Sequence, residues 1–416
     1  MTFLSYKNYR RYLVLNLIHS FGSISRTRLA DITGYRPAAI GEIISELMEE
    51  QLIVETGSAH VGQGRRRTLL EINGSYICAI GMYISASSVT YAVSTIHGVI
   101  LKTVETEIPE SGSSSQLIAQ IIATLRGLIQ EFSHLKILGI GICDPGHDPG
   151  VLDTSTDFSV SFVHFNDWIH YDLRSILEES VGLPVETSST SILISVAEQK
   201  FGAANGMNDF ICLELCNGIG MSFFSNGSVV KGAAGMAGQI GHTVVHSNDR
   251  ICYCGKPGCA EYSSSFPAIK ANIISALNNG VASVLNTFYD RSRELTVSDV
   301  RRALDQHDKM CMHYVKEAAG IMGIAIANAV NMLNPEAVIF HGYMLELGDY
   351  FITALKEAIL DNTLSYLCSS IVFKVSDISL DSMLPLGAAA MIFNSYLNTE
   401  EFKWILRLQD SAEEKP

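Results

Sequence analysis

Long apolar runs are missing from this sequence of 416 residues, and no stretch reaches the roughly 18 uninterrupted apolar residues of a membrane-spanning helix. The first apolar run ends at His19 and Ser20 without a small-residue cleavage site, which argues against a signal peptide. Charged residues are also few, at 17%, whereas hydrophobic residues make up 47%. This composition excludes a disordered chain and predicts a folded, cytoplasmic protein of two or three domains.

Positive charge is scarce as well, because 29 basic residues stand against 43 acidic ones and the net charge is −14. Such a chain is poorly suited to bind nucleic acid over its whole surface. Residues 1–75 differ, since they hold nine basic and seven acidic residues and leave a net charge of −16 on the remainder. This asymmetry predicts a protein that contacts a polyanion with its N-terminal end only.

Three helices are predicted within residues 1–75. Apolar spacing favours a first helix over residues 7–19. Ser25 is a candidate N-cap for a second helix over residues 26–33, which Gly34 would end. Pro37 would open a third helix, because proline is well tolerated at the first helical position.

A hairpin is predicted after these helices, with strands over residues 52–55 and 68–72 and a polar loop from residue 56 that ends in three arginines. This order is typical of a winged helix-turn-helix domain, whose third helix enters the major groove by its N-terminal end while the wing contacts phosphates or the minor groove. The predicted DNA contacts are Tyr35, Arg36, Pro37, Ala38, Arg65, Arg66 and Arg67. The alternative is a three-helix cap with a solvated arginine loop. Four glutamates restrict any contact to the first turn of the third helix: Glu42, Glu46, Glu49 and Glu50.

Short apolar runs alternate with helical patterns after residue 75. Strands are predicted over residues 77–82, 89–93, 99–104 and 137–142, with a helix over 116–132. This order predicts an α/β lobe over residues 76–200. A second lobe over residues 201–416 is expected to begin with a strand over 211–215, and its C-terminal helix could return to the first lobe.

Three of the nine cysteines are crowded together, at positions 252, 254 and 259, with C-x-C-x4-C spacing. Crowded cysteines in a cytoplasmic chain favour a metal over a disulfide. His242 is the candidate fourth ligand, with His246 as the alternative, and three cysteines with one histidine form a closed structural zinc site. An unmetallated loop or a redox pair is the competing interpretation. The other six resemble inert core thiols: Cys78, Cys143, Cys212, Cys216, Cys311 and Cys368.

The segment from Gly238 to His242, followed by Cys252, Cys254, Cys259 and Glu261, resembles the signature of the ROK family, which joins sugar-responsive repressors and sugar kinases. The resemblance covers nearly the whole chain. It implies an α/β fold of two actin-like (ribonuclease H-like) lobes with a sugar site, and the basic head is similar to that of the family's repressors.

The resemblance also implies which residues contact a sugar. In the family, an Asn-Asp pair, a Glu-x-Gly-His motif and the glutamate after the last cysteine hold sugar hydroxyls. Here His242 and Glu261 match, Gln239 replaces the first glutamate, and Ser189 and Thr190 occupy the positions of the Asn-Asp pair. The alternative is that Gln239 and Glu261 only support the metal ligands.

The motifs of a kinase are incomplete. The family's aspartate is the general base, and Thr190 cannot accept a proton near neutral pH. The kinases' Asp-x-Gly-x-Thr loop is absent after the first strand of the body, where residues 81–87 read GMYISAS, and the second phosphate loop, 216–220, is partial. The prediction is therefore a non-enzymatic regulator that binds a DNA operator as a homo-oligomer and responds to a sugar or sugar phosphate. An active kinase with an added head, and a regulator controlled by a protein partner, are the alternatives.

Overall fold

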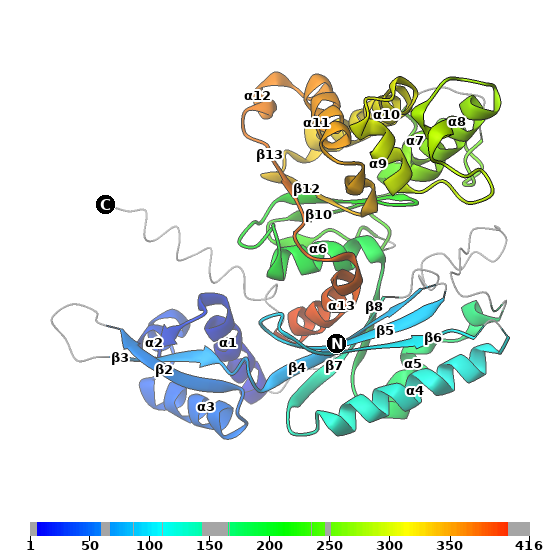
Figure 1. Ribbon diagram of the computed structural model, residues 1–416. Coiled ribbons are helices and arrows are strands. Elements are labelled where there is room, and N and C mark those ends of the chain that lie inside the picture. Colours follow the sequence, from blue (N-terminus) through cyan, green and yellow to red (C-terminus); the bar gives the residue numbers. More distant parts are fainter. Residues whose placement is uncertain are drawn as a thin grey trace. The chain divides into compact units, whose positions relative to one another are not determined.

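In the computed structural model the chain divides into two compact units (Figure 1). The first comprises residues 1–143, 162–187 and 388–416, and the second comprises residues 144–161 and 188–387. The structure describes residues 6–59, 67–85, 87–109, 111–143, 165, 167–233, 235–245 and 251–397. Within these residues no helix is long and apolar enough to cross a membrane.

The N-terminal part of the first unit has three helices and a small antiparallel sheet. The helices are α1 (Tyr6–Phe21), α2 (Arg26–Thr33) and α3 (Pro37–Glu49), and the strands β1 (Ile24–Ser25), β2 (Ile53–Ala59) and β3 (Arg67–Ile72) lie in the order β1-β3-β2. The Ser25 side chain accepts a hydrogen bond from the Arg28 amide, and Gly34 ends α2 with a left-handed φ of 68°. The predicted bounds of α2 and the winged helix-turn-helix order are confirmed.

Strand β2 corrects one prediction about the wing. The polar loop was expected from residue 56, but the strand continues to Ala59. Its register shifts between Thr56 and Ser58, and Gly57 has a φ of 39°. A β-bulge of this kind allows a strand to continue past an irregular residue.

A five-stranded sheet forms the rest of the first unit, in the order β6-β5-β4-β7-β8. Strand β4 pairs antiparallel with β5 and parallel with β7. Helices α4 and α5 cover one face of this sheet (Figure 1). The elements are β4 (Ile77–Ile84), β5 (Ser88–Thr95), β6 (Ile100–Glu107), α4 (Ser114–Glu131), β7 (Lys136–Cys143), η1 (Trp168–His170), α5 (Leu173–Val181) and β8 (Val185–Ser188).

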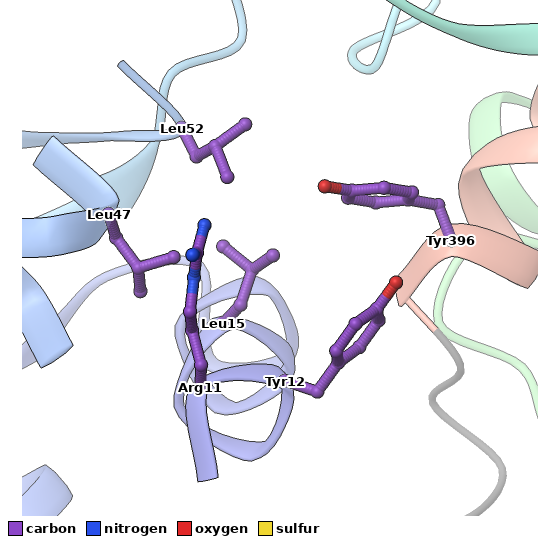
Figure 2. Close-up of a pocket in the computed structure, with 6 residues that line it drawn as sticks. All are labelled: Arg11, Tyr12, Leu15, Leu47, Leu52 and Tyr396. Carbon is purple, nitrogen blue, oxygen red and sulfur yellow. The ribbon is translucent and has the colours of Figure 1, made fainter. Parts of the chain in front are cut away.

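The winged domain shares its core with this sheet. Ile18 and Leu47 of the winged domain belong to the same buried apolar cluster as Ile77 and Leu138 of the sheet and Phe393 of α13 (Leu380–Leu397). A pocket of about 210 Å³ lies beside this cluster, and Figure 2 shows the residues that line it. They are Arg11, Tyr12, Leu15, Leu47, Leu52 and Tyr396. Packing of the winged domain therefore involves both the sheet and the last described helix.

The second unit repeats the same strand order, as β11-β10-β9-β12-β13. Its first strands are antiparallel, and β12 is parallel to both β9 and β13. The strands are β9 (Phe210–Leu215), β10 (Ile219–Ser225), β11 (Ser228–Val229), β12 (Ala337–His341) and β13 (Val372–Val375). The repeated order, in which three antiparallel strands are joined by a strand parallel to the first of them and then by a fifth strand, confirms the prediction of two ribonuclease H-like α/β lobes.

Helices and single turns surround this second sheet. They are α6 (Thr190–Phe201), η2 (Ile240–His242), α7 (Ala260–Ser264), α8 (Phe266–Asn278), η3 (Val284–Thr287), α9 (Val297–Asp305), α10 (Lys309–Leu333), η4 (Tyr343–Leu347), α11 (Asp349–Asn362) and α12 (Ser365–Cys368). The long helix α10 packs mainly on α11, and Gly323 allows this approach because a Cβ there would lie 2.4 Å from the Ala358 side chain. Turn η2 and helix α7, which follow β10 and β11 in the chain, carry the residues of the candidate site.

Candidate metal centre and ligand site

Four side chains of types that bind metals converge in the second unit. The ligand atoms of His242, Cys252, Cys254 and Cys259 all lie within 4.8 Å of one another. The Sγ atoms of Cys254 and Cys259 are 3.3 Å apart, and Cys252 Sγ lies 3.8 Å from His242 Nδ1. Three thiols and an imidazole at these separations could hold a metal ion with tetrahedral coordination. The alternative ligand His246 lies outside the described residues.

Glycines in the cysteine loop make this convergence possible. Gly255 and Gly258 have φ values of 76° and 82°, in the left-handed region that residues with a Cβ rarely adopt. The Gly255 amide donates to the Cys252 carbonyl at 2.8 Å, which closes the first turn. As a result the loop folds back on itself, and Cys252 and Cys259 are buried.

The Tyr253 hydroxyl lies between two predicted sugar-contact residues. It donates to Glu261 Oε1 at 2.5 Å and is 3.2 Å from His242 Nε2. The rings of Tyr253 and His242 meet edge to face, with centroids 5.2 Å apart. Partial burial, followed by the hydrogen bond to Glu261 and the charge of that carboxylate, raises the pKa of Tyr253. The phenol is therefore protonated at neutral pH and can act as a donor.

Glu261 is buried at the start of α7, only 7% exposed, and both of its oxygens have partners. Oε1 accepts the Tyr253 hydrogen bond, and Oε2 accepts from the Ile219 amide at 2.7 Å. Gly218 lies so close that a Cβ there would be 2.8 Å from Oε2. The carboxylate is thus fixed between the cysteine loop and the start of β10.

The remaining sugar-contact candidates lie on two elements. Gln239 is exposed and directly precedes η2, which contains His242. Ser189 is the N-cap residue of α6 but its side chain makes no capping hydrogen bond, and Thr190 is the first residue of that helix. The structure therefore brings His242 and Glu261 together through Tyr253, leaves the exposed Gln239 at the start of η2, and leaves Ser189 and Thr190 at the N-terminus of α6.

Glu214 of β9 contacts α6 and lies near Glu261, and the sequence analysis missed it. Ser191 Oγ donates to Glu214 Oε2 at 3.1 Å. Burial raises the pKa of Glu214, the Ser191 hydrogen bond lowers it, and the nearby charge of Glu261 raises it further. A single charged residue inside the apolar strand β9 was the available signal.

In each of the two segments that stand where the kinases have phosphate loops, a described side chain makes an internal hydrogen bond. After β4, the Ser85 hydroxyl donates to the Ser88 carbonyl at 2.9 Å and accepts from the Ser88 amide at 2.9 Å. After β9, the Tyr343 hydroxyl donates to Asn217 Oδ1 at 2.6 Å. Polar groups of both segments are thus engaged within the protein.

The predicted DNA-contact residues lie on an accessible turn where the structure describes them. Arg36, Pro37 and Ala38 are exposed at the N-terminus of α3. The Tyr35 ring is half-buried under the guanidinium of Arg10, which lies 4.5 Å from the ring centroid. Arg65 and Arg66 lie outside the described residues, and Arg67 begins β3.

Fold and site together define a class: a two-lobed, actin-like α/β protein with a winged helix-turn-helix head and a Cys/His cluster in the second lobe. The chain belongs to the ROK family, whose profile matches residues 79–394. The actin-like fold is shared with the ROK hexokinase of Thermus thermophilus, with a TM-score of 0.62, 20% identity and coverage of 77% of this chain and 99% of the hexokinase.

Several relatives match almost the whole chain. The xylose repressor of Caldicellulosiruptor bescii is 27% identical over 399 residues, covering 95% of this chain and 98% of the repressor. The N-acetylglucosamine repressor of Escherichia coli O157:H7 is 24% identical, with 92% of each chain covered. A solved ROK family transcriptional regulator, a homologue of the E. coli MLC protein, has a TM-score of 0.78 at 22% identity and covers 96% of this chain and 99% of its own.

Proposed function

We propose that the protein is a sugar-responsive, DNA-binding transcriptional regulator that represses genes of carbohydrate uptake or catabolism. One observation carries this proposal: the repressor and regulator matches cover 92% to 96% of this chain, well beyond the family profile of residues 79–394, whereas the hexokinase match covers 77%. The exposed turn at the start of α3 supports DNA contact by Arg36, Pro37 and Ala38. Arg65, Arg66 and Arg67 are proposed to contact phosphates, and Tyr35 to position the turn.

The sugar site is proposed to lie beside the Cys/His cluster. Gln239, His242 and Glu261 offer an amide, an imidazole N–H and a carboxylate, which together can both donate to and accept from hydroxyl groups. Ser189 and Thr190 would complete the site from the N-terminus of α6. A ligand changes DNA binding only through its affinity difference between two states of the protein, so sugar binding must favour a state with weaker operator affinity.

The metal is proposed to be zinc in a structural role. Three cysteines and one histidine fill a tetrahedral shell and leave no position for water or substrate. The ion would fix the loop that carries Tyr253 and leads into Glu261.

Two copies of the chain are proposed to bind a two-part operator, because winged regulators read half-sites as dimers.

Loss of phosphoryl transfer is also part of the proposal. Thr190 replaces the general base, and Ser85 and Asn217, in the two segments that replace phosphate loops, are hydrogen-bonded within the protein. Glu214 favours the alternative of an active kinase, because it is a carboxylate with a raised pKa next to the N-terminus of α6. When it is ionised, however, this carboxylate, two residues before the second loop, would repel nucleotide phosphates.

Selection of duplexes from a random DNA library tests the regulator function. The selected duplex should bind at least about a thousandfold more tightly than unrelated DNA. One of D-xylose, D-glucose or N-acetyl-D-glucosamine should weaken this binding, measured by fluorescence anisotropy. Arg36→Ala should change the selected sequence, and uniform weakening would limit Arg36 to phosphate contact.

Three other results would redirect the proposal. Sugar-dependent ATP turnover would establish the kinase. Specific DNA binding without any calorimetric signal from sugars would favour control by a protein partner. Failure to select any duplex would refute the regulator.

A further inference from the structure

Tyr253 occupies the middle position of the C-x-C motif and is not a metal ligand, yet it makes specific contacts. Its hydroxyl contacts both His242 Nε2, at 3.2 Å, and Glu261 Oε1, at 2.5 Å. These are two of the residues that the proposed function assigns to sugar hydroxyls. No sugar is needed to satisfy either group while Tyr253 is in this position.

The direction of these hydrogen bonds follows from the surrounding groups. His242 Nδ1 lies 3.8 Å from Cys252 Sγ, on the side of the candidate metal site, so we assign the proton to Nε2, the tautomer that leaves Nδ1 able to bind a metal. The Tyr253 oxygen therefore accepts from His242, and its O–H donates to Glu261. Glu261 in turn accepts from the Ile219 amide with its other oxygen, so each polar group in this series of hydrogen bonds is paired.

A sugar hydroxyl can make the same two hydrogen bonds, because it also accepts one and donates one. We propose that the Tyr253 hydroxyl takes the place of a ligand hydroxyl in the ligand-free protein, and that a neutral polyhydroxy ligand must displace it to bind. This inference rests on the proposed sugar site. It makes Tyr253 a residue that determines both affinity and specificity.

The position of Tyr253 allows such displacement. The residue is 56% exposed, so the ring can turn toward solvent without opening the core. Gly255 follows two residues later in an open position, since a Cβ added there would meet no atom within 4 Å. Glu261, by contrast, is buried and held by Ile219, so it would remain in place when the tyrosine leaves.

Competition of this kind predicts that removal of the hydroxyl increases sugar affinity. While an internal contact blocks the site, the ligand binds only the open fraction of the molecules, and the apparent Kd equals the intrinsic Kd divided by that fraction. Abolishing the contact therefore lowers the apparent Kd to its intrinsic value. Loss of a hydrogen bond to a charged carboxylate changes the equilibrium between the blocked and the open site by about tenfold. Tyr253→Phe should therefore bind the sugar about tenfold more tightly than the unchanged protein. The affinity for an analogue that lacks the displacing hydroxyl should be the same in Tyr253→Phe and in the unchanged protein.

Calorimetric titration of the full-length protein tests this inference with D-xylose, D-glucose, N-acetyl-D-glucosamine and their monodeoxy analogues. Tyr366→Phe is the matched control, because Tyr366 is 70% exposed on α12 of the same unit. Metal content and thermal stability of both variants verify that the loop remains folded. Tyr253→Ala provides a second variant with the same expected direction.

The outcomes separate this inference from the proposed function. Tighter sugar binding by both Tyr253 variants, with no change in the control, supports displacement. If a sugar binds the unchanged protein and Tyr253→Phe binds it equally or more weakly, Tyr253 is not a competitor and the inference fails while the regulator stands. If no sugar binds any of the proteins, the sugar-responsive function fails and the inference fails with it.

Discussion

Cys259 connects the Cys/His cluster with the candidate ligand site. Its sulfur lies 3.3 Å from that of Cys254, its side chain is fully buried, and the residue is the N-cap of α7. Glu261 lies two residues further on, in the first turn of that helix. A change at Cys259 should therefore affect metal binding and the position of the carboxylate together.

Cys259→Ser is expected to lose the metal, because a serine hydroxyl is not ionised at neutral pH and does not replace a thiolate ligand. The free energy of unfolding should fall by about 3 kcal/mol, since the loop loses its cross-link. Atomic absorption on the purified protein measures the metal, and thermal unfolding measures the stability. Cys368→Ser, outside the cluster, should keep full metal content. A metal-replete Cys259→Ser protein would show that the ligand set is wrong.

Residue spacing predicted the contacts that are local in the chain, and it missed those that are not. The four candidate metal ligands lie within 18 positions of one another, and their convergence agrees with the C-x-C-x4-C pattern and an upstream histidine. The bond between Ser191 and Glu214 spans 23 positions, and that between Tyr343 and Asn217 spans 126. Such pairs depend on how strands and helices pack, which a single sequence does not specify.

Helix boundaries were predictable where capping residues mark them. Helix α2 begins and ends at the expected residues because Ser25 caps it and Gly34 adopts a left-handed conformation. Helix α3 begins at Pro37 as expected. The extent of β2 was underestimated because a bulge at Gly57 continues a strand that polar residues suggested was a loop.

Helix α13 depends on a glycine in strand β7. A Cβ at Gly141 would lie 1.9 Å from the carbonyl oxygen of Ala388, and backbone atoms cannot retreat as a flexible side chain could. The strand and the helix therefore approach each other as closely as their backbones allow. This contact lies within the first unit and supports the same core that the winged domain shares.

Gly141→Ala should therefore destabilise the protein by about 2 kcal/mol or more, because the added methyl group separates α13 from β7. Gly127→Ala is the matched control: Gly127 is exposed in α4, and nothing lies within 4 Å of its Cβ position. Alanine favours a helix over glycine, so this control should stabilise by roughly 0.5–1 kcal/mol. Urea unfolding followed by circular dichroism measures both. Equal stability of the two variants would contradict the close packing of α13 on β7.

At the scale of the whole molecule, charge is divided unevenly along the chain. The head has a small positive excess, although the complete chain has a net charge of −14. Two of its arginines are engaged internally, since Arg11 pairs with Glu50 and Arg26 pairs with Glu55. The acidic remainder repels DNA phosphates, so binding must depend on the few cations that the head presents.

The three arginines of the wing should therefore account for much of the salt dependence. Replacement of Arg65, Arg66 and Arg67 together by alanine is expected to weaken binding to every duplex. It should also reduce the slope of log K against log salt concentration by about 2.7, because each phosphate contact contributes about 0.9. Anisotropy titrations from 50 to about 200 mM salt measure this slope. Arg174→Ala, on α5 of the same unit, should leave it unchanged. An unaltered slope in the triple variant would mean that the wing does not contact the phosphate backbone, and that the turn at Arg36 binds DNA without it.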